Sequence, residues 1–425
     1  MCNELEILEG WDERILYDLA EYHNGAAFKP KDWVEDGLPI VRIEQINKPN
    51  SETDKFNGFV LPRNLIDTGD LIFSWSATLK VIIWSGGPAV LNQHLYKVVP
   101  NSGVNKQLLL QILDFNMEKL AGQSQGSTMK HVTRKELTKF RVKFPLNENE
   151  QEKIAIILRT VDEAIEKTEA LIEKYGLIKA GMMHDLFTRG LTPDGKLRPP
   201  RDQAPELYKE TPIGWIPKEW EYGKFGENVA VIDPNPSHRY PDEVSEGYPI
   251  CSTENFSGED GFDFKKSKLV PEKTFQQQNN RCQYKELDVI FARKGRIGFA
   301  RRYGSDKKAF SHTVVIMKPI SPDIEASWLL WLSRSDWLLK AIDRKMNTNS
   351  GVPTLGVDFI KNIEVPIPSP DEQRAIDTSL EAASRRIQIE TDRKQKLALQ
   401  KSGLMRDLLT GEVPVKVNDP EAAHV

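Results

Sequence analysis

Two long stretches of the chain carry apolar side chains at every third or fourth position. Within each stretch, 148–190 and 370–411, no proline interrupts the apolar stripe. This spacing is typical of a helix with one apolar seam, and about 35 such residues give a helix about 50 Å long. The alternative is that each helix packs only on its own domain. We expect two long antiparallel helices that pair as a coiled coil through Ile154, Leu158, Val161, Ile165, Ile172, Tyr175, Ile376, Leu380, Ile387 and Leu397.

Outside these stretches, short β-rich runs alternate with helical segments. The runs lie at 71–75, 81–84, 289–292 and 313–317, and the helical segments at 106–120 and 327–344. Such alternation is typical of α/β or α+β domains. We therefore expect a first domain at 1–147, a long helix at 148–190, a linker at 191–212, a second domain at 213–369, a second long helix at 370–411 and a flexible tail at 412–425.

The chain also repeats itself. Asp70-Leu71-Ile72-Phe73 recurs as Asp288-Val289-Ile290-Phe291, and a histidine, His94 or His312, follows each aspartate at the same distance. Residues 150–188 align without a gap on 372–410, with about a third of the positions identical. The sequence therefore predicts two tandem copies of one domain, each followed by a long helix.

Charge is distributed unevenly along the chain. The net charge of −4 conceals a basic segment at 119–143, with seven Lys or Arg against one acid, and another at 261–308, with thirteen against five. Basic segments of this kind are typical of surfaces that bind nucleic acid. No apolar run approaches the ~18 residues of a membrane helix, and the three cysteines form no CxxC pair, so we expect a cytoplasmic protein without a cysteine-based metal site.

Four short motifs carry a resemblance to a known family. A proline-led turn precedes Glu150-Gln151 and Glu372-Gln373, the second helix ends as Gly403-Leu404-Met405-Arg406-Asp407-Leu408-Leu409-Thr410-Gly411, and Gly214-Trp215-Ile216-Pro217 opens the second domain. In this combination, over nearly the whole chain, the sequence resembles the specificity subunit of type I restriction–modification systems.

The resemblance implies a division of labour among subunits. Two target recognition domains would each read one half of a bipartite double-stranded DNA site, and the paired helices would fix the unread spacer. Two methyltransferase subunits, carrying S-adenosylmethionine, would dock on the helices, and restriction subunits that use ATP and Mg would join them. This chain itself would hold no catalytic residue, cofactor or metal.

The candidate DNA contacts lie in loops beside strands. In 126–131, hydroxyl groups and backbone N–H groups can hold phosphates, while in 293–298 two glycines permit close approach and arginine can pair with guanine. The constant offset between the copies places 75–80 opposite 293–298. The alternatives are a solvated loop and a plain surface turn. The candidates are Lys80, Ser127, Thr128, Lys130, His131, Arg134 and Lys135 in the first domain, and Arg293, Lys294, Arg296, Arg301, Arg302 and Asn349 in the second, with Lys307 and Lys308 extending the basic surface.

Catalytic motifs are missing from the sequence. It contains neither a glycine-rich cofactor loop with an Asn/Asp-Pro-Pro-aromatic string, nor Glu-x-Lys, nor a phosphate-binding GxxxxGK[ST] loop. His94 and His312 stand in apolar surroundings without a second ligand nearby, so we expect hydrogen-bonded structural histidines rather than catalytic or metal-binding ones. The alternative function is a coiled-coil assembly protein without DNA specificity.

Overall fold

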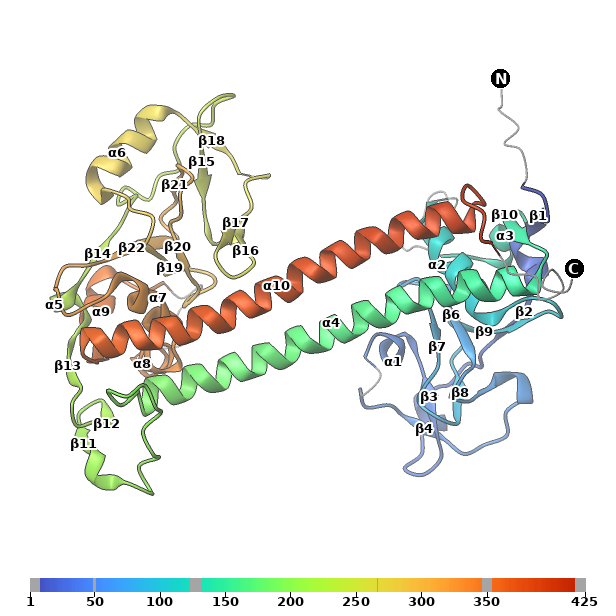
Figure 1. Cartoon of the computed structure of the whole chain (residues 1–425), viewed down its shortest axis with the longest axis horizontal. Helices are drawn as coiled ribbons and strands as arrows, with labels where there is room; N and C mark the ends of the chain where they lie inside the picture. The colour runs from blue at the N-terminus through green and yellow to red at the C-terminus, as the bar shows by residue number, and fades with distance from the viewer. Residues whose placement is uncertain (1–7, 49–50, 123–130, 266, 346–353, 417–425) are drawn as a thin grey trace, which may run out of the picture. The chain divides into compact units, whose positions relative to one another are not determined.

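The computed structural model describes residues 8–48, 51–122, 131–265, 267–345 and 354–416. The chain divides into two compact units: unit 1 consists of Met1–Ala170 with Glu390–Val425, and unit 2 of Leu171–Ile389. The boundary falls inside the two long helices, α4 (Glu148–Thr188) and α10 (Pro370–Leu409), so that each helix contributes one half to each unit (Figure 1).

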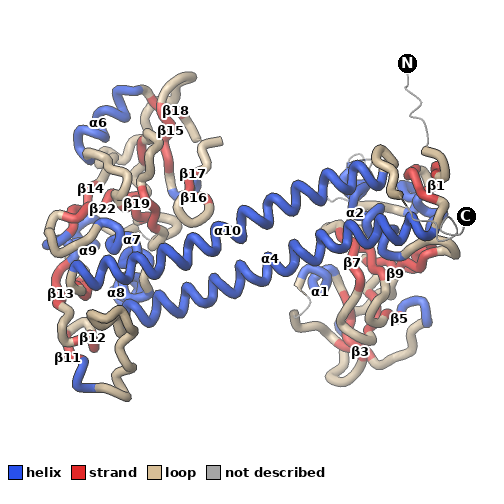
Figure 2. The backbone as a smooth tube through the Cα atoms, in the orientation of Figure 1, coloured by secondary structure: helices blue, strands red, loops and turns tan. Residues whose placement is uncertain are grey.

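Unit 1 is built on two four-stranded sheets. The antiparallel sheet has the order β2-β9-β6-β7, and the mixed sheet has the order β4-β3-β8-β5, in which β3 and β8 are parallel. A third pair, β1 with β10, is antiparallel. Figure 2 shows the strands in red and the helices in blue. The bounds are β1 (Trp11–Ile15), β2 (Ala20–Asn24), β3 (Leu38–Val41), β4 (Lys55–Phe56), β5 (Leu65–Ile66), β6 (Leu71–Ser74), β7 (Lys80–Ile83), β8 (Ala89–Leu91), β9 (Leu95–Pro100) and β10 (Arg141–Pro145).

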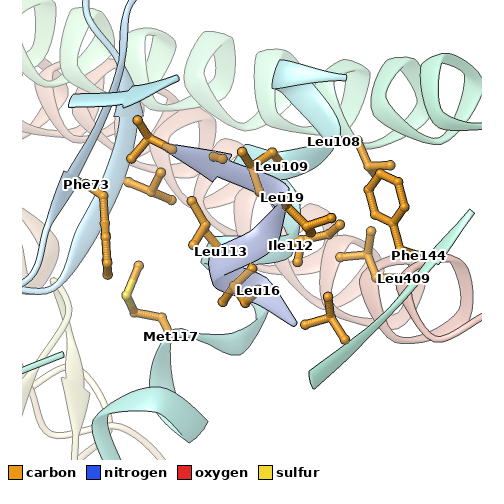
Figure 3. Packing of buried hydrophobic residues seen from close by; sticks show 14 of the residues in the cluster. Leu16, Leu19, Phe73, Leu108, Leu109, Ile112, Leu113, Met117, Phe144 and Leu409 are labelled. Atoms are coloured by element: carbon orange, nitrogen blue, oxygen red, sulfur yellow. The ribbon is translucent and has the colours of Figure 1, made fainter. Parts of the chain in front are cut away.

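The core of unit 1 lies between its antiparallel sheet and its helices. Alternate residues of a strand point to opposite faces, and β6 is buried on both: Leu71 and Phe73 join the helix-side core, and Ile72 joins the second sheet. Figure 3 shows the helix-side core, where Leu109 and Leu113 pack near Leu16 and Leu19. The helices of this unit besides α4 and α10 are η1 (Leu16–Leu19), η2 (Pro30–Asp32), α1 (Ile43–Asn47), η3 (Pro62–Asn64), α2 (Lys106–Gly122) and α3 (Arg134–Leu137).

Unit 2 repeats this architecture. Its antiparallel sheet has the order β14-β22-β19-β20, and β19 is again buried on both faces. A three-stranded sheet, β18-β15-β21, corresponds to the mixed sheet of unit 1, and β13 pairs with β23 as β1 pairs with β10. The bounds are β11 (Tyr208–Thr211), β12 (Gly214–Pro217), β13 (Glu221–Lys224), β14 (Val229–Ile232), β15 (Tyr248–Cys251), β16 (Phe256–Ser257), β17 (Gly261–Phe262), β18 (Leu269–Val270), β19 (Val289–Ala292), β20 (Ala300–Arg302), β21 (Ala309–Phe310), β22 (Val314–Pro319) and β23 (Glu364–Ile367).

Two details of unit 2 differ from the sequence-based expectation. The helix expected at 327–344 is broken at Ser335, whose backbone is extended and whose hydroxyl donates to Leu332 O (2.7 Å). The expected linker at 191–212 contains η4 and strand β11, which forms a hairpin with β12. The helices of this unit besides α4 and α10 are η4 (Pro205–Leu207), α5 (Phe225–Asn228), η5 (Thr253–Asn255), α6 (Glu272–Cys282), α7 (Ala326–Arg334), α8 (Asp336–Lys345) and α9 (Val357–Lys361).

The two long helices start in the same way. Gln151 and Gln373, at equivalent repeat positions, are fully buried, and each amide makes three hydrogen bonds to the backbone. Gln151 accepts from Asn105 N and donates to Gly103 O and Pro145 O. Gln373 accepts from Glu325 N and donates to Asp323 O and Pro368 O. The repeated Glu-Gln motif therefore fixes each helix to the domain that precedes it.

Within each unit, α4 and α10 pack on each other and run in opposite directions. In unit 1 the beginning of α4 shares a core with the end of α10, and in unit 2 the end of α4 shares a core with the beginning of α10. This confirms the expected fold class of two tandem α+β domains with long antiparallel helices. Of the expected seam residues, Ile154, Leu158, Ile376 and Leu380 are fully buried, and Val161, Ile165, Ile172, Tyr175, Ile387 and Leu397 are half-buried.

Candidate nucleic-acid interface

In unit 1, three segments meet where the central strand β6 ends. The chain continues from β6 into Trp75, whose carbonyl accepts from Val132 N at 2.8 Å, and Ser76 bridges to His131. The Trp75 ring lies 5.8 Å from the ring centroid of His94, 5.8 Å from that of Tyr96 and 6.1 Å from that of His131. We call Trp75, His94, Tyr96 and His131 the unit 1 cluster.

Unit 2 has the same backbone arrangement at the end of β19. The chain continues into Arg293, whose carbonyl accepts from Leu355 N at 2.9 Å, and Lys294 bridges to Thr354. The His312 ring takes the place of the His94 ring and lies 5.3 Å from the ring of His238. The two copies thus bring equivalent loops together, in agreement with the constant offset between 75–80 and 293–298.

Arg293 is held inside the unit. Its side chain is 6% exposed, its Nη2 lies 2.6 Å from Asp233 Oδ2, and its Nε donates to His312 O at 2.9 Å. The same Nη2 lies 3.2 Å from His238 Nε2. The sequence predicts a direct DNA contact at Arg293. In the structure, its side chain instead links the end of β19 to the loop that follows β14. We define Asp233, His238, Arg293 and His312 as the unit 2 cluster.

The exposed cations of this region follow Arg293 in the same loop. Arg296 is exposed, with its guanidinium 5.7 Å from the Phe299 ring centroid, and Lys294 is half-exposed. Gly295 has a φ of +75°, and a Cβ added there would approach only the Thr253 hydroxyl, whereas a Cβ on Gly298 would meet Leu339 Cδ2 at 2.3 Å. Gly295 therefore provides the turn, and Gly298 provides close packing against α8.

Several other predicted basic contacts face the protein interior. Arg301 is 6% exposed with its guanidinium 4.9 Å from the Phe256 ring centroid, and Arg302 pairs with Glu381. Lys308 is 1% exposed, with Nζ 4.3 Å from the ring centroid of Tyr303. Burial lowers the pKa of Lys308. The expectation that Lys308 extends a basic surface is wrong, because the ammonium group sits among aromatic rings.

The remaining candidates of unit 1 lie at the edge of its cluster. Arg134 and Lys135 are exposed on α3, and Arg134 Nη2 donates to Tyr22 O at 3.0 Å. The Lys80 ammonium donates to Ile46 O at 3.1 Å and is half-buried. Four predicted contacts lie outside the described residues: Ser127, Thr128, Lys130 and Asn349.

Both clusters contain polar atoms that the described chain does not satisfy. Trp75 Nε1, His131 Nδ1 and His312 Nδ1 are buried without a hydrogen-bond partner among the described residues. The pKa of His312 is lowered, mainly by burial and then by the charges of Lys294, His238 and Arg293. The two histidines differ in their surroundings: His94 is exposed, with its Nε2 3.4 Å from Gln93 Nε2, whereas His312 is half-buried. In the described part of the chain no His, Cys, Asp and Glu group is arranged to hold a metal ion.

Sequence reasoning missed half of these cluster residues. Trp75 lies in the segment that the offset aligns with 293–298, but its ring carries no charge and gave no signal of its own. Asp233 and His238 belong to a different loop, about 60 residues before Arg293, and no repeat marks them.

Among the described residues, no helix is both long enough and apolar enough to cross a membrane.

The geometry defines a protein with two copies of one α+β fold and one loop cluster in each copy. The family model described as the type I restriction modification DNA specificity domain matches residues 8–174 and 217–399. The chain belongs to this family, whose members are non-catalytic specificity subunits.

Similar proteins match over most of their length. The type I restriction enzyme MjaVIII specificity subunit of Methanocaldococcus jannaschii is 24% identical, with 97% of this chain and 95% of the relative covered. The EcoBI specificity subunit of Escherichia coli is 23% identical, with 88% and 79% covered. The crystal structure of the S subunit from M. genitalium superimposes with a TM-score of 0.58 at 15% identity, covering 96% of this chain and 98% of that chain. This last similarity supports the fold.

Proposed function

We propose that this chain reads a bipartite DNA target, one half with each unit, and carries the methyltransferase and restriction subunits of a type I system. The observation that supports this most is the pair of clusters: the same backbone arrangement at the ends of β6 and β19 holds different side chains. A shared scaffold with divergent loops suits two half-sites of different sequence.

The exposed groups around each cluster have the chemistry that duplex DNA requires. In unit 2, the exposed Arg296 can pair with guanine or bridge phosphates, and the half-exposed Lys294 precedes it in the same loop. In unit 1, the guanidinium of Arg134 lies 6.0 Å from the ring centroid of Tyr96 in the cluster, and the exposed Lys135 adds positive charge on the same helix. Because Arg293, Arg301 and Arg302 are engaged inside the unit, we assign them to positioning and folding rather than to DNA contact.

The long helices are the surfaces that we assign to partner subunits and to the spacer. The methyltransferase subunits would bring S-adenosylmethionine, and the restriction subunits ATP and Mg, because the sequence of this chain has no motif for these groups. The domain boundaries we propose remain those of the sequence: recognition domains at 1–147 and 213–369, and spacer helices at 148–190 and 370–411.

The test is the methylation pattern of cells with and without this gene. A bipartite methylated sequence that appears only with the gene supports the proposal, and exchanging residues 213–369 for those of a relative should change one half alone. Inserting seven residues into both helices, within 160–174 and 382–396, should lengthen the tolerated spacer and leave both halves unchanged. Changed bases at a fixed spacing would contradict the assignment of helices and domains.

A coiled-coil assembly protein remains the competing function. It would bind random and specific duplexes equally, and its affinity would fall equally for both as salt is raised. A specificity subunit keeps a difference between duplexes at every salt concentration. Filter or fluorescence binding with the methyltransferase complex measures that difference directly.

A further inference from the structure

Unit 2 contains a polar helix that has no counterpart among the described residues of unit 1. Between the paired strands β3–β4 and the central strand β6, unit 1 has the short turn η3 and strand β5. At the same place, between β18 and β19, unit 2 has the 11-residue helix α6 (Figure 1). Because the antiparallel sheets of the two units have corresponding strand orders, α6 is a candidate source of different recognition.

The helix is held firmly by one face. The buried side chains of α6 are Phe275, Gln278 and Cys282, spaced as one helical stripe. Gln278 donates to Phe310 O and accepts from Phe310 N, both at 2.8 Å, so its amide pairs with the backbone of strand β21. The Phe275 ring stacks on Tyr248 with centroids 4.5 Å apart. A sequence this rich in Gln and Asn forms a helix here because tertiary contacts fix it.

The opposite face consists of amides and cations. Lys273, Gln276, Gln277 and Asn280 are exposed on the side of the helix opposite to the buried stripe, which we call the amide face, and Arg281 is exposed at its edge. The side-chain amides of Gln277 and Asn280 make no hydrogen bond within the described part of the chain. Solvated helices of this protein look different: on α4, Arg159 and Lys167 both pair with Glu163 at i,i+4 spacing. A face of unpaired amides is suited to a ligand that presents donors and acceptors together.

The amide face is continuous with the unit 2 cluster. An open pocket of about 300 Å³ lies between α6 and the loop that follows β14, lined by Arg239, Tyr240, Thr274, Gln277 and Arg281 among others. The same loop carries His238, which lies 3.2 Å from Arg293. One duplex lying on the cluster therefore has this helix beside it. A helix of 11 residues is about 16 Å long, and the major groove, about 12 Å wide, admits a helix.

We propose that α6 is a recognition helix that reads base edges in the major groove of the half-site bound by unit 2. Gln277 and Asn280 supply the amides, which pair with the adenine edge, and Lys273 and Arg281 supply positive charge toward the phosphates. Unit 1 reads its half-site through loops. This inference rests on the proposed function, and it adds the element and the side chains by which one half is read.

The experiment uses the full chain assembled with its methyltransferase subunits and the double variant Gln277→Ala with Asn280→Ala. Duplexes carrying single base-pair changes in either half-site compete for binding. The exchange of residues 213–369 identifies the half-site that unit 2 reads. At one or two base pairs of that half-site, discrimination between bases should fall about tenfold or more, and discrimination in the other half-site should be unaffected. The matched control is Gln276→Ala, because Gln276 is exposed on the same helix but its amide is already hydrogen-bonded to Glu272, one turn earlier.

Three results would overturn the assignment of α6. These are unchanged discrimination at both halves, an equal loss of affinity for all duplexes, and weaker methyltransferase binding with normal discrimination in the assembled fraction. The last would make the face a protein-docking surface. An unchanged melting temperature shows that the variant is folded. If the proposed function itself is wrong, the wild-type complex will not discriminate between base pairs in either half-site. That result differs from all three results above.

Discussion

At the end of its central strand, unit 1 carries the Trp75 ring among histidine and tyrosine rings, whereas unit 2 carries Arg293 in an ion pair with Asp233. The backbone bonds around the two positions are the same: Val132 N donates to Trp75 O as Leu355 N donates to Arg293 O. Hydrogen bonds of the main chain thus keep the loop geometry while the side chains diverge. A duplicated scaffold of this kind can change what each copy binds without altering how it folds.

The same comparison applies to the start of the long helices. The glutamines of the Glu-Gln motif play one role in both copies, but the glutamates do not. Glu372 accepts from Arg198 Nη1 and from Leu191 N, both at 2.6 Å, in a buried site, whereas Glu150 accepts from Trp11 Nε1 at 3.0 Å in a partly exposed one. We therefore expect the two glutamates to contribute differently to the free energy of unfolding of their units.

Removing these glutamates should give the largest effect. We expect Glu372→Ala to destabilise unit 2 by about 3 kcal/mol, because Arg198 would be left buried without its main carboxylate partner. Glu150→Ala should cost unit 1 about 1 kcal/mol, as for one ordinary hydrogen bond. Hydrogen exchange during urea unfolding reports each unit separately. Equal losses in the two variants would show that the different surroundings of the motif have no energetic consequence.

Replacing the glutamines should give smaller and equal effects. Gln151→Ala and Gln373→Ala each leave one part-buried N–H and two carbonyls without their side-chain partner, which we expect to cost about 2 kcal/mol in the unit concerned. Thermal unfolding followed unit by unit is the measurement. Thr160→Ala, on the exposed surface of α4, is a suitable control because its hydroxyl bonds only to Ile156 O of its own helix. A twofold difference between the glutamine variants would break the equivalence of the copies.

The parts of the fold that could be predicted are those with a periodic apolar pattern or a repeat in the sequence. The apolar stripes predicted α4 and α10, and the runs at 71–75 and 289–292 correspond to β6 and β19, because strands buried on both faces are continuously apolar. Helix α6 was not predicted. Its few apolar residues make no clear stripe, and the contact that fixes it joins Gln278 to the backbone of Phe310, 32 residues away.

The site was predictable in position but only partly in residues. A run of cations after a strand indicated the loop at 293–298, yet sequence alone does not separate Arg296, which is exposed, from Arg293, which is buried. The difference arises because Asp233, 60 residues earlier, faces the guanidinium of Arg293. Charge counts share this weakness, since Lys308 and Arg301 contribute to the basic segment but not to the surface.

Arg296→Ala tests whether the loop at the end of β19 contributes to base discrimination by unit 2 alone. We expect discrimination in the half-site read by unit 2 to fall about tenfold, which corresponds to about 1.4 kcal/mol, with no change in the other half. The offset places Thr78 at the equivalent position in unit 1, so Thr78→Ala should affect only the other half, and less, because a hydroxyl makes fewer bonds to a base than a guanidinium. Competition binding with base-substituted duplexes measures both. Uniform weakening on all DNA would mean that Arg296 contacts phosphate.

The smallest effect is a pH dependence confined to unit 2. Burial, followed by the charges of Lys294, His238 and Arg293, lowers the pKa of His312, and only Asp233 opposes this. The unfolded chain therefore binds the proton first as pH falls below about 6.5, so the stability of unit 2 should decrease from there until the folded-state pKa is reached. His312→Gln should remove this slope, and unfolding measured between pH 7.5 and 5 compares the two proteins. DNA bound at the cluster should oppose the loss, because nearby phosphates favour the protonated ring. A slope that persists in His312→Gln would assign the dependence to other groups.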